Sequence, residues 1–270
     1  MNVIIIRFGE IWLKGKNKFL FENKLTRNIR IFLKKKNIIF RIKKFRSRVL
    51  IYTNKKVPDL KYIFGITSFS YAKEINLNIG DMKKEILKLC KKQKTFRITA
   101  KRLAKDINLN SQKINELLGG YVIKKFKLKV NLENPEQNIC IEIFNKKAYV
   151  FDNNKNTAKC YGGLPVGISG LATLILEDKS SLLAGILMLK RGCSLEIINK
   201  NKINYEVLEK FSYGSRLNKV KTPNNYSYAI IVNETLENYK KRKSRKMILR
   251  PLISFTRENI KKYMDYYNFK

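Results

Sequence analysis

Apolar residues in the first part of the chain follow two different periods. They dominate residues 2–8 and recur at helical spacing across Asn17–Lys36, which predicts a strand followed by a helix. Apolar runs at Ile38–Ile42 and Arg48–Tyr52 predict two further strands, and a helical turn is expected at Pro58–Phe64. A β-α-β-β order of this kind is typical of a ferredoxin-like module.

The middle of the chain has its own set of predicted elements, beginning near Ile66. Asn110 and Ser111 form an N-cap signal, after which helical periodicity continues to about Lys124. An earlier helix is predicted at Asp81–Lys92. The predicted strands of this region are Ser68–Ile75, Phe96–Thr99, Lys127–Leu132, Asn138–Phe144 and Ala148–Phe151.

The last third contains the pattern of a buried strand, a short polar loop and an amphipathic helix. The apolar run Leu171–Leu176 is followed by Glu-Asp-Lys-Ser-Ser and then by the apolar-rich segment Leu182–Lys190. In such a unit, phosphates bind to backbone N–H groups of the loop and to the positive end of the helix. A strand at Ser227–Val232 and a helix at Thr256–Tyr267 are also predicted.

These patterns predict an α/β protein of three units, at residues 1–65, 66–165 and 166–270. The first is ferredoxin-like, and the last is a shortened, doubly wound parallel sheet. No apolar run approaches the length of a membrane span, and the run Val3–Ile6 is too short for a signal peptide. We therefore expect a cytoplasmic protein.

The charge balance points to a polyanionic partner. Lys and Arg number 58 against 21 acidic residues, a net charge of +37. Residues 1–60 hold 17 of the basic residues against 3 acidic ones. Codon bias toward Lys would raise the charge evenly, so this uneven distribution favours RNA binding.

Cysteine and histidine usage excludes several classes of site. The chain has no histidine and no Cys-x-x-Cys pair, which excludes Cys/His zinc sites and His-based triads. Cys90, Cys140, Cys160 and Cys193 are expected to be free, reduced thiols. Cys140 shares a predicted strand face with polar neighbours, so its thiol is expected to be accessible.

Several motifs resemble the tRNA 4-thiouridine synthetases, a family of tRNA sulfurtransferases. The segment Arg7-Phe-Gly-Glu-Ile-Trp-Leu-Lys-Gly-Lys-Asn-Lys is similar to the start of that family. Phe96-Arg-Ile-Thr-Ala-Lys-Arg, Asn115-Glu116, Gly119 and Val130-Asn-Leu-x-Asn-Pro135 resemble its tRNA-binding THUMP domain. Lys and Arg side chains clustered at the end of a strand can bind backbone phosphates without contacting base edges. The candidate RNA-binding residues are Lys14, Lys16, Lys18, Lys101, Arg102 and Lys105.

The resemblance also implies a nucleotide loop, but the residues of that loop differ here. The family's pyrophosphatase-type (PP) loop Ser-Gly-Gly-x-Asp-Ser corresponds to Leu176, Glu177, Asp178, Lys179, Ser180 and Ser181, of which only the last serine matches. A carboxylate about 4 Å from a phosphate charge costs roughly 4 kcal/mol at an effective dielectric near 20. We expect loss of ATP binding, with a metal held by Glu177 and Asp178 as the alternative.

Two other departures concern the same domain. The family's Gly-Glu-Ser-Leu is Asn233-Glu-Thr-Leu here, and no counterpart of the family's catalytic cysteine follows Cys193. No rhodanese-like domain is expected either. The run Lys240–Lys246, basic at six of seven positions, is interpreted either as a solvated helix face or as an extension of a phosphate track.

We therefore expect a tRNA-binding member of the family, associated with formation of 4-thiouridine at position 8 of tRNA and without ATP-dependent catalysis of its own. No cofactor is expected, except ATP and Mg if the family's activity is retained. The expected partners are tRNA and, as a further candidate, a separate catalytic or sulfur-carrier protein. An active sulfurtransferase with a rebuilt site and a general basic RNA-binding protein are the two alternatives.

Overall fold

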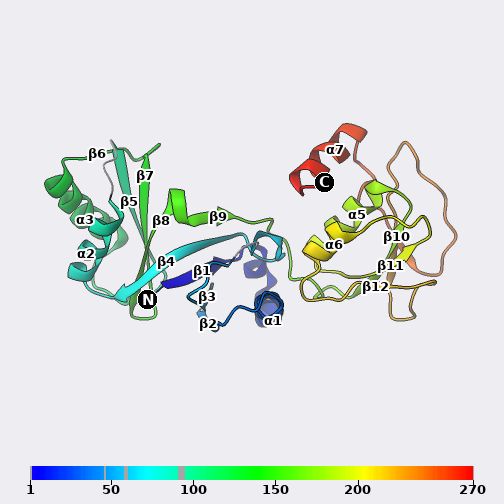
Figure 1. The fold of residues 1–270 in the computed structure, drawn as a ribbon, viewed down its shortest axis with the longest axis horizontal. Helices are drawn as coiled ribbons and strands as arrows, with labels where there is room; N and C mark the ends of the chain where they lie inside the picture. Colours follow the sequence, from blue (N-terminus) through cyan, green and yellow to red (C-terminus); the bar gives the residue numbers. More distant parts are fainter. Residues whose placement is uncertain (1, 46, 58–59, 91–94, 270) are drawn as a thin grey trace. The chain divides into compact units, whose positions relative to one another are not determined.

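A computed structural model describes residues 2–45, 47–57, 60–90 and 95–269, without the side chains of residues 12–14 (Figure 1). The chain forms two compact units. Unit 1 comprises Met1–Arg7, Ile39–Lys56 and Ser68–Lys159, and unit 2 comprises Phe8–Ile38, Val57–Thr67 and Cys160–Lys270. In the part of the chain that the structure describes, no helix is both long and apolar enough to cross a bilayer.

Unit 1 is built on one continuous mixed sheet. Strand β4 joins its two halves, because it pairs antiparallel with β1 on one side and with β8 on the other. The strands predicted for the ferredoxin-like module and for the second module therefore share one sheet. The strand order is β2 (Arg41–Phe45), β3 (Arg48–Tyr52), β1 (Asn2–Arg7), β4 (Ser68–Asn76), β8 (Lys147–Asp152), β7 (Gln137–Phe144), β5 (Thr95–Arg102) and β6 (Lys129–Val130), with β9 (Thr157–Lys159) paired to β4.

Two helices of unit 1, α2 (Ile79–Leu89) and α3 (Ser111–Phe126), cover the part of the sheet formed by β5, β7 and β8. Met82 and Ile86 of α2 and Ile114, Leu118 and Val122 of α3 are fully buried in this core. The predicted N-cap is confirmed, since the Asn110 side chain accepts a hydrogen bond from the backbone N–H of Lys113 at 2.7 Å. A single turn, α4 (Asn153–Asn156), follows β8.

Unit 2 contains the predicted doubly wound parallel sheet. All neighbouring strands are parallel, and β10, the first of these five strands in chain order, lies at the centre. If the five strands are numbered from one to five in chain order, their order across the sheet is 3-2-1-4-5, which is the doubly wound order. Across the sheet the strands are β12 (Asn218–Lys219), β11 (Ser194–Asn199), β10 (Leu171–Leu176), β13 (Ala229–Ile231) and β14 (Met247–Leu249).

Three helices of this domain lie on the same face of the parallel sheet. α5 (Lys179–Lys190) contacts both α6 (Glu206–Phe211) and α7 (Arg257–Tyr266), and Figure 1 shows all three to one side of β10 and β11. Between the sheet and α5 lies an apolar core. The strand residues in this core are Ala172, Leu174, Leu176, Leu195, Ile197, Ala229 and Ile231.

Unit 2 also includes the helix predicted near the N-terminus, α1 (Lys18–Lys35). The Asn28 side chain donates to the carbonyl of Val166 at 3.1 Å, and the Phe32 ring lies 4.8 Å from the Tyr213 ring. Gly214 is required at this contact, because a Cβ atom there would lie 2.0 Å from Oδ1 of Asn28. The helix therefore packs against segments more than 130 residues away in sequence.

The segment before α1 forms a 3-10 helix, η1 (Glu10–Asn17). This helix is kinked at Gly15, whose φ of +50° suits a residue without a Cβ atom. A second short 3-10 helix, η2 (Leu60–Tyr62), lies within the turn predicted at Pro58–Phe64, of which residues 58 and 59 lie outside the described part.

Other predicted elements are shifted for local reasons. The strand predicted at Ile38–Ile42 begins at Arg41, because the N–H of Ile38 bonds to the carbonyl of Leu33 and so belongs to the end of α1. The run Lys240–Lys246 forms no helix and is an irregular connection that leads into β14. The short strands β9, β11, β12 and β14 and the helices α4 and α6 were not predicted.

Candidate functional site

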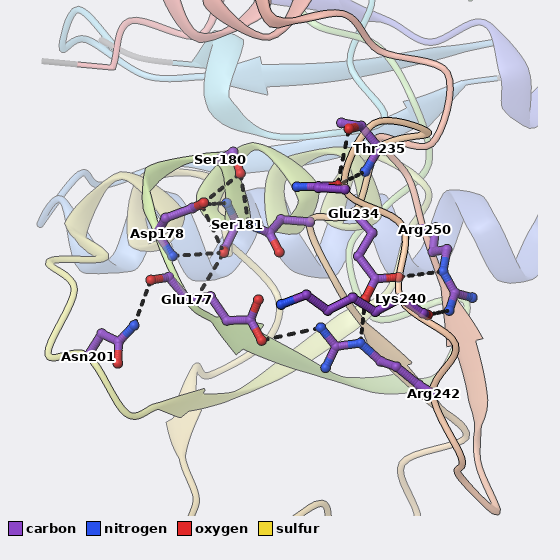
Figure 2. Close-up of polar contacts among 12 residues, drawn as sticks. Glu177, Asp178, Ser180, Ser181, Asn201, Glu234, Thr235, Lys240, Arg242 and Arg250 are labelled. Atoms are coloured by element: carbon purple, nitrogen blue, oxygen red, sulfur yellow. Dashed lines mark hydrogen bonds and ion pairs between the residues drawn. The ribbon is translucent and has the colours of Figure 1, made fainter.

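The candidate site lies at the carboxyl ends of β10 and β13. Doubly wound sheets bind ligands in the crevice outside the carboxyl ends of their strands, where the strand order reverses. Here that reversal falls between these two strands, which are paired along Ala172–Leu174 and Ala229–Ile231. The predicted loop follows β10, and residues 233–235 follow β13, so the structure brings the two segments together (Figure 2).

The loop after β10 is closed by hydrogen bonds within itself. Asp178 is the N-cap of α5, and its carboxylate accepts from the backbone N–H of Ser181 at 3.1 Å and from the hydroxyl of Ser180 at 2.7 Å. In return, the Ser181 hydroxyl accepts from the backbone N–H groups of Asp178 at 3.2 Å and Glu177 at 3.1 Å. This capping box binds the N–H groups that a phosphate-binding loop would offer to its ligand.

Two asparagines hold this loop from neighbouring segments. Asn201, after β11, donates its side-chain N–H to the carbonyl of Glu177 at 2.8 Å. Asn233, after β13, donates to the Ser180 hydroxyl at 2.9 Å. The loop is thus fixed to the ends of both strands that flank β10.

A buried carboxylate lies next to the loop. Glu234 is 2% exposed and accepts hydrogen bonds from Nε of Arg242 and, at 2.7 Å, from Nε of Arg250. Arg242 also reaches Oε1 of Glu177 at 3.3 Å, and Arg250 reaches the carbonyl of Lys240 at 3.2 Å. Figure 2 shows this arginine–carboxylate cluster across the carboxyl ends of the strands.

The hydrogen bonds set the ionisation of both carboxylates. Burial disfavours the charge of Glu234, but the hydrogen bonds and charges of Arg242 and Arg250 outweigh it and lower the pKa of Glu234 below its ordinary value. Burial likewise opposes ionisation of Asp178, whose pKa is nevertheless lowered by hydrogen bonds from Ser180, Ser181 and Asn233. Both groups are therefore held as carboxylates at neutral pH.

As arranged, the donors that could hold a nucleoside triphosphate at this edge are bonded to other groups of the protein. The N–H groups of Glu177 and Asp178 are bonded to Ser181, and both arginines are bonded to Glu234. Glu177 and Asp178, which the sequence resemblance aligns with two glycines of the family's loop, have different protein partners, Arg242 and Ser180. Within the residues that the structure describes, no group of three or more Cys, Asp and Glu side chains is placed to hold a metal ion.

The predicted RNA-binding cations fall in different units. In unit 1, Lys101 and Lys105 are exposed, whereas Arg102 is half-buried and donates to the carbonyl of Ile107 at 3.1 Å. In unit 2, Lys16 is exposed and Lys18 lies 3.5 Å from Glu22. The side chain of Lys14 lies outside the described residues. Their role in RNA binding stays a prediction.

The four cysteines are free thiols, as expected. The predicted accessibility of Cys140 is only partial, because the residue is half-buried and burial raises the pKa of its thiol to about 11. Burial also raises the pKa of Cys90 to about 11 and that of Cys160 to about 12. Thiols with such pKa values are poor nucleophiles at neutral pH.

The sequence prediction missed the roles of Arg242 and Arg250. Sequence analysis placed Arg242 in a basic run interpreted either as a solvated helix face or as an extension of a phosphate track, and it gave Arg250 no role. A signal existed in Glu234, an acidic residue three positions after the end of an apolar strand, since a charge that is buried there needs a cationic partner.

Comparison with known proteins agrees with this architecture. Family models match residues 3–70, as a ThiI ferredoxin-like domain, and residues 74–152, as a THUMP domain. A probable tRNA sulfurtransferase of Mycoplasmopsis synoviae is 42% identical over 197 residues, which cover 72% of this chain and 50% of that protein. One of Bacillus pumilus is 31% identical over 269 residues, which cover 92% and 66%.

Two solved structures are similar over the whole chain. PH1313 from Pyrococcus horikoshii Ot3 has a TM-score of 0.85 and 27% identity, with all of both chains covered. A 4-thiouridine synthetase, solved in complex with RNA and with bound ATP, has a TM-score of 0.77 and 26% identity over 99% of this chain and 85% of that one.

The fold and these matches define a protein that joins a ferredoxin-like module and a THUMP domain to a doubly wound parallel sheet. The chain belongs to the ThiI family of tRNA sulfurtransferases. It spans about half the length of the curated relatives that it matches first.

Proposed function

We propose that this chain binds tRNA in the pathway that forms 4-thiouridine at position 8, and that its own parallel-sheet domain does not bind ATP for catalysis. The RNA part of the proposal is supported by the THUMP match and by the similarity to a synthetase solved with RNA. The 38 basic and 12 acidic residues of the segment 1–165 give it the charge that phosphates attract.

A single observation carries the ATP part of the proposal. At the point where the strand order reverses, the loop N–H groups are bonded to Ser181 and the two arginines to Glu234. A bound triphosphate would have to break these contacts and come close to the carboxylates of Glu177 and Asp178. Like charges at that distance cost several kcal/mol.

An active enzyme with a rebuilt site is the second candidate. It is favoured by the similarity to a relative solved with bound ATP and by the presence of two arginines at the same edge of the sheet. Arg242 and Arg250 would serve as phosphate ligands only after leaving Glu234. The two candidates therefore differ in whether the folded chain binds ATP–Mg.

Calorimetric titration of the full chain with ATP–Mg tests this difference. We expect no binding at millimolar nucleotide, whereas binding that is lost in Arg242→Ala would support the rebuilt enzyme.

Mass spectrometry of tRNA nucleosides from cells without the gene tests the pathway, with loss of 4-thiouridine as the expected result. Unchanged 4-thiouridine would leave a general RNA-binding protein as the better description.

Binding to folded tRNA is the remaining test. We expect the full chain to prefer a folded tRNA transcript over single-stranded RNA of equal length. Replacing the exposed Lys101 and Lys105 by Ala should lower the log–log salt slope by about 0.9 for each lost contact with duplex phosphates. The matched control is Lys261→Ala with Lys262→Ala on α7, for which an unchanged slope is expected. Equal slopes for both variants would remove these two lysines from the interface.

If the chain does not supply ATP chemistry itself, a separate catalytic or sulfur-carrier protein is the partner that the proposal requires. Co-purification of such a protein with the tagged chain, followed by thiolation of tRNA by the pair but by neither alone, would support this part. Thiolation by the chain alone would contradict it.

A further inference from the structure

One face of the parallel sheet in unit 2 lacks the helices that its topology calls for. Parallel sheets in α/β proteins are covered on both faces. Because crossovers are right-handed, the connections β10–β11 and β11–β12 place α5 and α6 on one face. The connections β12–β13 and β13–β14 run in the opposite direction across the sheet, so their crossovers fall on the other face. These two connections, residues 220–228 and 232–246, are fully described and contain no helix (Figure 1).

The amino-terminal half of this second face is covered by one of those connections. Glu196 is buried and accepts hydrogen bonds from the Thr173 hydroxyl at 2.6 Å and from the backbone N–H of Asn224 at 2.8 Å. Lys246 holds the same connection through the carbonyls of Asn224, Asn225 and Ser227. These contacts fix the connection on the sheet without a helix.

The carboxyl-terminal half of the face remains open. A cavity of about 560 Å³ lies there, and its lining includes Ile175, Ile198 and Ile230 from the three neighbouring strands β10, β11 and β13. Ile175 and Ile230 are half-buried, and Ile198 is 8% exposed. Aliphatic side chains in this position on a parallel sheet are normally covered by a crossover helix.

The rim of the cavity is cationic. Lys200, Lys221 and Arg242 line it, together with a single acidic residue among the described lining, Glu177, which is paired with Arg242. Lys200 and Lys221 are exposed, as are four basic residues of the neighbouring connection, Lys240, Lys241, Lys243 and Arg245. An apolar floor with a basic rim complements a ligand with one apolar and one acidic face.

We infer that this face is the docking site for an acidic amphipathic helix of a partner protein, which supplies the missing helical cover. The dimensions agree, since three strands about 4.8 Å apart span about 10 Å, the diameter of an α-helix. A second copy of this chain is disfavoured as the occupant, because each copy carries +37. Single-stranded RNA is disfavoured because bases stack on aromatic side chains, and the described lining has none.

The inference is independent of the proposed function, because it rests on the sheet topology and on the lining of the cavity. It can be tested with the full chain and a synthetic acidic peptide of 18 residues. The peptide has Leu at i, i+3, i+4 and i+7 spacing and Glu at most other positions, and a scrambled peptide of the same composition is its control. Binding is measured by fluorescence anisotropy, and the isoleucine methyl signals are followed by NMR.

We expect the amphipathic peptide to bind at least about tenfold more tightly than the scrambled one. It should shift the methyl signals of Ile175, Ile198 and Ile230 but not those of Ile139 and Ile141, which lie in the core of unit 1. Lys200→Glu with Lys221→Glu should weaken binding by about tenfold or more. The matched control, Lys261→Glu with Lys262→Glu on the opposite face, should change it less than about twofold.

Three results would overturn the inference. Equal binding of the scrambled peptide would mean that the net charge alone attracts it. Displacement of the peptide by single-stranded RNA, with shifts of the same methyl signals, would assign the face to nucleic acid. Dilution-dependent shifts of those methyl signals without any peptide would assign it to a second copy of the chain. None of these results bears on whether the domain binds ATP–Mg, so the two proposals can fail separately.

Discussion

Each unit of the molecule contains a buried glutamate held by two arginines, and the two clusters differ in what surrounds them. In unit 1, Glu142 on β7 accepts from Nε of Arg7 and from Nε of Arg48, each at 2.8 Å. In unit 2, Glu234 accepts from Arg242 and Arg250. Glu142 is 5% exposed and Glu234 is 2% exposed, so the local chemistry is nearly the same.

The positions of the two glutamates in their sheets give them different consequences. Glu142 lies within a continuous sheet, and its arginines come from β1 and β3, so the cluster joins strands of the two modules matched by separate family models. Glu234 lies outside the carboxyl end of β13, where doubly wound sheets bind ligands. A similar ion cluster thus stabilises a sheet in one unit and occupies a potential ligand site in the other.

The largest effect is expected from removing the carboxylate in unit 1. Glu142→Ala removes the carboxylate that pairs with Arg7 and Arg48 in a buried site, and breaking a buried pair in this way costs about 3–5 kcal/mol. Denaturant unfolding followed by circular dichroism measures the loss. Hydrogen exchange should locate it in β1, β3 and β7, with unit 2 unchanged; equal loss of protection in unit 2 would contradict the separation of the two units.

Substitution in unit 2 should have a smaller effect on stability. Glu234→Gln keeps the shape and one acceptor but removes the charge that binds Arg242 and Arg250, and hydrogen bonds to charged groups contribute about 1.5–3 kcal/mol. Hydrogen exchange in β13 and β14 measures the change. As a matched control, Glu237→Gln removes the charge of an exposed glutamate from the same connection and should change these rates little. If both variants behave alike, the cluster does not hold this edge of the sheet.

Sequence analysis could not predict the ion pairs of these two clusters, although it did predict strands of the sheets in which they lie. Period-2 and continuous apolar patterns predicted β3 and β10 with their observed bounds. Glu177 and Arg242, however, are 65 residues apart, and nothing local distinguishes Arg242 from the exposed Lys241 and Lys243 beside it. Strand β11 was missed for a related reason: Glu196 interrupts its apolar run, and its burial is explained only by hydrogen bonds from the distant Thr173 and Asn224.

Acid should remove the stabilisation by Glu234 without any mutation. Its folded-state pKa is lowered, so its contribution is fully present above the unfolded value of about 4.3 and is lost as the pH falls through the folded-state pKa. Protonation removes the same charge as Glu234→Gln. The difference in unfolding free energy between wild type and this variant should therefore be constant from pH 7 to about pH 5 and shrink below about pH 4. A difference that persists undiminished at lower pH would show that the charge of Glu234 is not its source.

The smallest effect is expected at the loop itself, where stability and nucleotide binding can be separated. Asp178→Ala removes the N-cap of α5 and should cost about 1 kcal/mol, whereas Asp178→Ser keeps a capping oxygen and should cost only a few tenths. Both variants remove the same negative charge from the loop.

Nucleotide binding by the same two variants separates charge from geometry. If repulsion by the Asp178 carboxylate excludes ATP–Mg, both variants should bind it better than wild type. If the bonded N–H groups exclude it, neither variant should bind it better, because the Ser181 hydroxyl still accepts from the N–H of residue 178. Glu177→Gly with Asp178→Gly removes both carboxylates and frees Arg242 from one of its partners, so weak nucleotide binding is expected from this variant. Calorimetric titration of all three, beside an unfolding curve for each, decides between charge and geometry. Tight binding of ATP–Mg by the wild type would contradict both explanations.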